Sequence, residues 1–228
     1  METKQITLIA SSHDELGELN SNELYKILQK IKPEIIFEEI FFTRSRENEF
    51  IYDIENTVET IAINKYINRH KVKHVPVDFD YSFIINDIKF LYNKLDSIND
   101  TKYKENNKKK SYLMGKYGFK CLNSCDFESV IDELKDIEKR LIIELNDVEL
   151  MNIFESWEKI NDKRGDEMVK NIYQYSKKSD YNDAVFIFGV AHKKSIHQKI
   201  MYYNDKYQIK VNWKLYGYEN CCIRANGI

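Results

Sequence analysis

Four short apolar segments, each followed closely by an ionisable side chain, constrain the fold of this chain more than any other feature of its sequence. They lie at residues 5–10, 34–37, 72–77 and 184–188. Each has the length and apolar character of a strand that is covered on both faces. Stretches in which apolar residues recur at helical spacing separate them. This alternation predicts an α/β fold with a largely parallel central sheet flanked by helices.

The helical stretches between the strands carry recognisable signals. Asn20 supplies a capping side chain, and apolar residues then recur at helical spacing from Leu24 to Ile31. A second helical pattern covers residues 49–69 and leads to the third strand. Because a single short helix joins the first two strands, we expect the strands at 5–10 and 34–37 to be parallel neighbours with a right-handed connection.

The region from residue 81 to residue 157 departs from this alternation. Apolar residues keep helical spacing over long stretches there, so we expect an α-helical insertion or cap. The lysine- and asparagine-rich run at residues 102–110 predicts a solvated loop. The last regular segment, residues 207–215, alternates apolar and polar side chains as an edge or antiparallel strand does. A length of 228 residues suits one domain with an insertion, so we expect a single domain over residues 1–228.

The composition limits the functional classes. The 35 basic and 37 acidic residues give a formal net charge of −2, which argues against binding to nucleic acid or to an anionic membrane as the main task. We therefore expect a small-molecule or peptide substrate, and a homo-oligomer stays open. There is no apolar run of membrane-spanning length, and the N-terminal residues do not have the pattern of a signal peptide. Four cysteines are too few for a disulfide scaffold. These features predict a cytoplasmic protein with reduced thiols.

Ionisable side chains follow the predicted strands at one edge of the sheet. They are His13, Glu38, Glu39, Asp78 and His192. Ligands collect beyond the carboxyl ends of parallel strands, because loops and helix N-termini converge there. We therefore expect His13 and His192 to face each other across one site. Imidazoles and carboxylates are ligands of divalent zinc, manganese or cobalt, and water bound to such an ion can attack a carbonyl group.

The motifs around these residues resemble those of a known superfamily. The runs I-A-S-S-H ending at His13 and F-G-V-A-H ending at His192 look like the paired G-x-x-H motifs of the TraB/Tiki superfamily, with Ala10 in place of the usual glycine. Residues 39–44, from a glutamate to Arg44, are similar to its E-x-x-x-x-R segment. The run R-G-D-E-M beginning at Arg164 resembles the arginine-led helix of that superfamily.

This resemblance covers about residues 5–80 and 160–200 and leaves out the helical middle. The broader group includes erythromycin-esterase-like and ChaN-like proteins. The resemblance implies a shared α/β fold and a metal-assisted hydrolase site.

Individual roles follow from strand geometry and from the resemblance. Strand alternation sends Glu38 and Glu39 to opposite sides, and the spacing to Arg44 favours Glu39 over Glu38. We expect Arg164 to orient a carboxylate or an anionic substrate group, and Arg44 and Asp78 to contact substrate. Each of these side chains also has a purely structural explanation, such as a turn cap or a solvated corner. The predicted metal ligands are His13, Glu39 and His192.

Three functional hypotheses follow. The preferred one is a metal-dependent hydrolase, in which metal-activated water attacks an amide or ester bond as in a peptidase or an esterase. The second is a metal-free, esterase-like hydrolase with His13 as general base. The third is a module that binds haem, a metal or a small ligand without catalysis.

Overall fold

Five parallel strands form one sheet in the order β3-β2-β4-β1-β5 in the computed structural model, which describes residues 3–41, 57–207 and 209–217. The strands are β1 (Lys4–Ser11), β2 (Ile35–Glu38), β3 (Lys73–Pro76), β4 (Asp183–Gly189) and β5 (Val211–Leu215). The predicted α/β class and the C-terminal edge strand are confirmed. β5 runs parallel to β1, so the antiparallel alternative for residues 207–215 is wrong.

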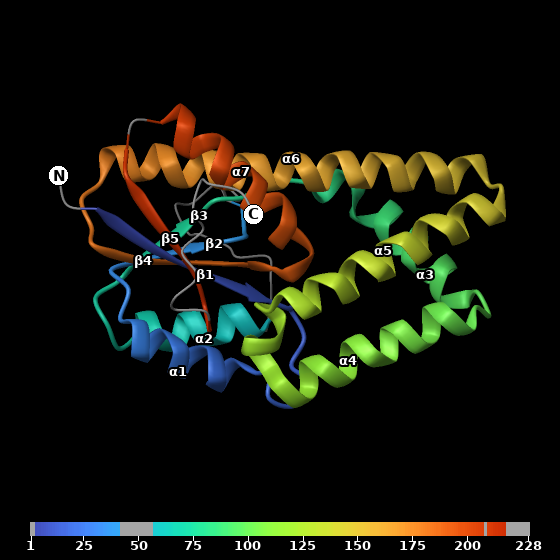
Figure 1. The fold of residues 1–228 in the computed structure, drawn as a ribbon. Coiled ribbons are helices and arrows are strands. Elements are labelled where there is room, and N and C mark those ends of the chain that lie inside the picture. Colours follow the sequence, from blue (N-terminus) through green and yellow to red (C-terminus); the bar gives the residue numbers. More distant parts are fainter. Residues whose placement is uncertain (1–2, 42–56, 208, 218–228) are drawn as a thin grey trace, which may run out of the picture.

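Helices cover both faces of the sheet. Figure 1 shows α1 (Ser21–Ile31) and α2 (Val58–Ile67) side by side on one face, and α6 (Val148–Lys178) with α7 (Lys193–Lys206) on the other. The short η2 (Val190–His192) links β4 to α7. Among the described residues, we find no helix that is both long enough and apolar enough to cross a membrane.

The part of the chain that connects β3 to β4 forms a helical arm, which extends beyond the sheet (Figure 1). We use this term for the helices between β3 and α6 together with the first half of α6, which coincide with the predicted insertion at residues 81–157. The elements of the arm that precede α6 are η1 (Ser82–Ile84), α3 (Ile85–Ser97), α4 (Thr101–Leu122) and α5 (Cys125–Leu145). The arm has its own small core from α3, α4, α5 and α6, built around Leu91, Leu95, Tyr103, Leu134, Leu141, Leu150 and Phe154.

The lysine-rich run at residues 102–110 is helical, so the prediction of a solvated loop is wrong. It lies in α4, where the side chain of Asp100 caps the helix by accepting from the Tyr103 nitrogen at 2.7 Å. Tyr103 and Asn106 are buried on one side, whereas most of the lysines in this run are exposed. A helix needs only one apolar stripe, and the density of lysines on the other sides hides it in the sequence.

β4 lies between β1 and β2, so the expectation that β1 and β2 are neighbours is wrong, although they are parallel. Residues 184–188 of β4 are all buried, and a strand of this apolar character is stable when it is paired on both edges. The register places Gly189 opposite Ser11 of β1 and Ile187 opposite Glu38 of β2. The carboxyl ends of all three strands therefore meet at one edge of the sheet.

α6 connects the arm to the sheet. Its second half buries Met168, Val169, Ile172 and Tyr173 in the main core. Arg164 is also buried and lies one turn before these residues, where the helix reaches the edge of the sheet.

Candidate active site at the sheet edge

A buried arginine joins three elements at this edge. Arg164 of α6 donates from Nη2 to Glu39 Oε1 at 2.6 Å, and from Nε and Nη2 to Asp78 Oδ2 at 2.9 and 2.7 Å. Its guanidinium carbon lies 3.8 Å from the centre of the Tyr81 ring. Charge-assisted hydrogen bonds and stacking on an aromatic face are the contacts that suit a guanidinium group. Arg164 thereby ties α6 to the residues that follow β2 and β3.

Glu39 is fully engaged in this network. Its Oε2 accepts from the Gly189 nitrogen at 2.6 Å, and its Oε1 lies 3.2 Å from His192 Nε2. Burial alone would raise the pKa of Glu39, but His192, Arg164 and the Gly189 hydrogen bond outweigh burial and hold the pKa below its ordinary value. His192 itself is only 4% exposed. We call Arg164, Glu39, Asp78 and His192 the arginine network.

His13 faces a different carboxylate. Its Nδ1 lies 3.6 Å from Glu59 Oε2, a distance that suits an ion pair rather than a hydrogen bond. The His13 side chain is 59% exposed, whereas that of Glu59 is 7% exposed. Among the described residues, neither carboxylate oxygen of Glu59 has a hydrogen-bond partner, and the buried Ser11 Oγ has none either. A buried carboxylate without hydrogen bonds depends on the nearby imidazolium to offset the cost of burying its charge.

The local backbone fixes Glu59 beside His13. The Val58 nitrogen donates to the His13 carbonyl oxygen at 3.1 Å, which ties the first turn of α2 to the loop after β1. Thr57 caps α2 by accepting from the Thr60 nitrogen at 3.2 Å. Glu59 therefore lies in the first turn of the helix, where the helix dipole favours a negative charge.

Each member of the pair shifts the pKa of the other. Glu59 raises the pKa of His13 from 6.5 to about 9, against the effect of burial, which lowers it. Burial would raise the pKa of Glu59, but His13, with smaller contributions from neighbouring polar groups, outweighs burial and lowers it. The charged form of the pair is therefore favoured at neutral pH.

One small cavity collects the side chains that follow β1 and β2, as expected for the carboxyl edge of a parallel sheet. Its polar lining comes from His13, Glu38, Glu39, Thr57, Glu59 and the backbone of Gly189. Glu38 is turned toward β3, where its Oε2 lies 2.6 Å from His74 Nε2. Burial raises the pKa of Glu38 despite this contact.

The structure brings most of the predicted residues into one region, but it divides them into two groups. Glu39, Asp78, Arg164 and His192 form the arginine network, whereas His13 pairs with Glu59. Both groups meet at the small cavity through Glu39. Glu38 lines that cavity as well. Arg44 lies outside the described residues.

Sequence reasoning missed Glu59 and the contact between His74 and Glu38. Glu59 precedes the buried Ala62 and Ile63 by three and four residues, so it shares the buried side of α2. A glutamate at such a position in the predicted helix was the available signal. For His74 the sequence contains no comparable signal, because its contact with Glu38 depends on the pairing of β2 with β3.

The predicted metal ligands do not fit a metal centre as they lie. Within the described ranges, no three His, Cys, Asp or Glu side chains are arranged to hold an ion. Glu39 has both oxygens engaged, and the adjacent guanidinium group of Arg164 opposes a second cation there. His13 faces Glu59 instead of sharing a partner with His192. The metal therefore stays a prediction that an experiment must test.

No family model, no curated protein sequence and no solved structure matches this chain. The resemblance to the TraB/Tiki superfamily stays a prediction that its motifs alone support. The function has to be argued from the chemistry of the site.

Proposed function

We propose that this chain hydrolyses an ester or amide bond in a small molecule or peptide, with His13 and Glu59 as the acid–base pair and no metal in the step. One observation carries the proposal: a buried carboxylate without a hydrogen-bond partner among the described residues faces a half-exposed imidazole on the wall of a cavity. An imidazole oriented by a carboxylate is a common arrangement for general acid–base catalysis.

The exposed edge of His13 can act on a water molecule. Since Nδ1 points to Glu59, Nε2 is directed away from that partner. The reactive form is the neutral imidazole, whose fraction grows as the pH approaches the His13 pKa of about 9, so turnover should rise with pH up to that value. In this form the water oxygen bonds to the carbonyl carbon while its proton passes to Nε2. The imidazolium then gives this proton to the leaving oxygen or nitrogen as the bond from that atom to the carbonyl carbon breaks. Glu59 stabilises the imidazolium between the two transfers.

The arginine network supports this pair without touching the reacting atoms. It fixes Glu39, which forms part of the cavity wall, and it joins α6 to the ends of β2, β3 and β4. A catalytic side chain is effective when its surroundings are held rigidly, so Arg164 acts as a positioning residue.

The test is an assay of the purified chain against p-nitrophenyl esters of increasing acyl length and against amino-acid p-nitroanilides. We expect turnover above the buffer rate, and its loss in both His13→Gln and Glu59→Gln. His70→Gln is a matched control, because His70 is exposed and stacks on Tyr66 away from the cavity. Full turnover in both cavity variants, or no turnover of any ester or anilide, would contradict the proposal.

A further inference from the structure

A second cavity lies beyond His192, between the helical arm and the start of α7. Its volume is about 220 Å³. Its walls come from α3, α5, α6, η2 and α7, and the residues that matter for its chemistry are Tyr92, Glu138, Phe154, Trp157, Glu158 and His192. We call this space the arm cavity. It is separate from the small cavity that His13 and Glu59 line.

Glu138 is the residue of the arm cavity that most needs a ligand. It is only 7% exposed, yet it makes no hydrogen bond or ion pair with the described residues, and it lines the cavity. Burial raises the pKa of Glu138 to about 7, although Lys110 and Lys135 lower it. A carboxylate in this position gains most from a cation that enters the cavity and brings its own charge and donors.

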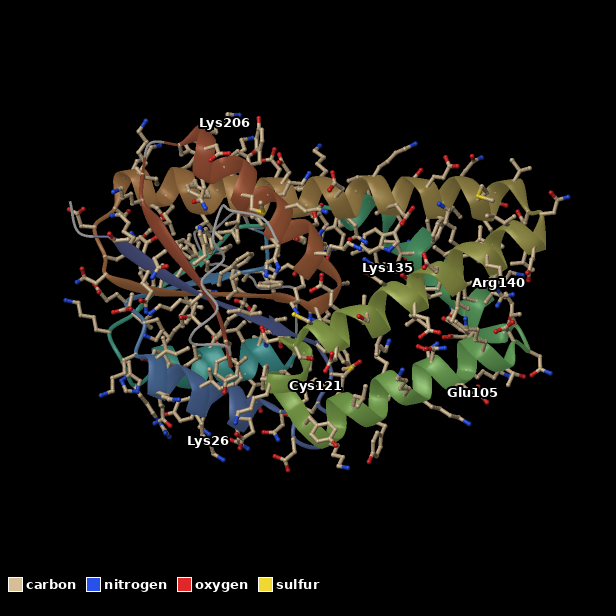
Figure 2. The ribbon with its side chains drawn as sticks, in the orientation of Figure 1. Lys26, Glu105, Cys121, Lys135, Arg140 and Lys206 are labelled. Atoms are coloured by element: carbon tan, nitrogen blue, oxygen red, sulfur yellow. The ribbon has the colours of Figure 1, made fainter. Side chains whose placement is uncertain are left out.

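The cations of the cavity wall are already engaged. Lys135, labelled in Figure 2 on α5, donates to the Ala191 carbonyl oxygen at 3.2 Å. Lys194 donates to Asp132 at 2.8 Å. Neither ammonium group forms a hydrogen bond or ion pair with Glu138, although Lys110 and Lys135 lower its pKa through space, so a carboxyl group without a close cation lines the cavity.

Aromatic side chains complete the cavity. Tyr92, Phe154 and Trp157 line it together with Glu138. The centre of the Trp157 ring also lies 5.9 Å from the guanidinium carbon of Arg164, so the indole ring lies beside the arginine network. A cavity lined by a carboxyl group and by aromatic rings suits an ammonium group on a hydrocarbon skeleton, because charge pairing and cation–π attraction act together.

We propose that the arm cavity binds a small organic amine, with its ammonium group at Glu138 and its carbon skeleton against Tyr92, Phe154 and Trp157. His192 lines this cavity and contacts Glu39, so an amine bound there lies beside the arginine network. This inference depends on the proposed hydrolase activity only if the amine that binds in the arm cavity is part of the hydrolysed substrate. Binding needs no turnover, and the two proposals can therefore fail separately.

The experiment compares two probes of nearly equal shape on the full chain by isothermal titration calorimetry. Benzylamine carries a positive charge at neutral pH, and benzyl alcohol does not. We expect benzylamine to bind at least about tenfold more tightly than benzyl alcohol. The isosteric Glu138→Gln variant should lose this preference. Glu133→Gln should keep it, because Glu133 lies on the same helix, faces Lys102 and does not line the cavity.

Equal affinity of the wild-type chain for the two probes would overturn the proposal, whatever the variants do. An unchanged preference in a folded Glu138→Gln variant would overturn it as well, and circular dichroism establishes that the variant is folded. Ester hydrolysis by the same preparations reports on the proposed function independently of either probe.

Discussion

The two histidines at the sheet edge have contrasting surroundings. His192 is buried and faces Glu39, whose oxygens also accept from Arg164 and Gly189. His13 is more than half exposed, and its partner Glu59 has no hydrogen bond among the described residues. A buried polar network that is fully satisfied stabilises one geometry, whereas an incompletely satisfied pair at a cavity is available for chemistry. We therefore place support at His192 and reactivity at His13.

The largest expected effect is on turnover. Replacing His13 by Gln should lower kcat/KM about 100- to 10,000-fold, because the general base is lost. The free energy of unfolding should fall by only about 1–2 kcal/mol, because Glu59 loses the imidazolium beside its buried charge but solvent around the exposed ring already weakens that pair. Enzyme kinetics and urea denaturation of the same preparation measure both quantities.

His192→Gln sharpens the same contrast. This variant should lose stability as well as activity, because it removes a buried partner of Glu39. If His13→Gln unfolds at much lower urea concentration than His192→Gln, the division of roles between the two histidines is reversed.

The second prediction concerns the arginine network. Arg164→Ala leaves Glu39 and Asp78 buried without their common cation, and we expect the free energy of unfolding to fall by about 3–5 kcal/mol. Urea denaturation is the measurement, and Lys163→Ala is the control, because Lys163 is the exposed neighbour on α6. Equal stability of the two variants would mean that the network does not support the site.

A smaller effect should appear at acid pH. The pKa of Glu39 is lower in the folded than in the unfolded chain, so its contribution to stability is present above its ordinary pKa of 4.5 and is lost as the pH falls below that value. The drop in unfolding free energy between pH 7 and pH 3 should be about 1–2 kcal/mol smaller in Glu39→Gln than in the wild-type chain. Identical drops would show that Glu39 is not held in its charged form.

The last prediction is an absence of effect. Treatment with EDTA followed by dialysis should leave hydrolysis unchanged, because Glu39 and His192 already contact each other and Glu39 also accepts from Arg164 and Gly189. Elemental analysis before and after treatment accompanies the assay. One equivalent of zinc, manganese or cobalt that is lost together with activity, and that is missing from both His13→Gln and His192→Gln, would restore the metal-dependent hypothesis.

Much of the fold could be predicted from local patterns. The strands at 5–10, 34–37, 72–77 and 184–188 follow from apolar runs whose boundaries depend on neighbouring residues alone. The position of β4 between β1 and β2 could not be predicted in this way, because strand order depends on which strands pair in space. The helical state of residues 102–110 was missed because packing against α5, rather than residue preference, buries its one apolar side.

In the candidate site, too, some residues could be predicted from the sequence and others could not. The ends of parallel strands had to meet at one edge, so Glu39 and His192 were predicted to lie near each other from sequence order alone. The partner of His13 could not be predicted, because Glu59 reaches His13 only when α2 packs beside the loop after β1. Residues that follow strands are therefore easier to predict than those that helices contribute.

The most direct test of this account is an NMR titration of the His13 ring in the wild-type chain and in Glu59→Gln. The chain has 5 histidines, and the signal that is missing from His13→Gln identifies the ring. We expect His13 to titrate at a pKa of about 9 in the wild-type chain and to fall toward its ordinary value of 6.5 in Glu59→Gln. A value near 6.5 that is the same in both proteins would contradict the pairing of His13 with Glu59 and the hydrolytic role proposed for it.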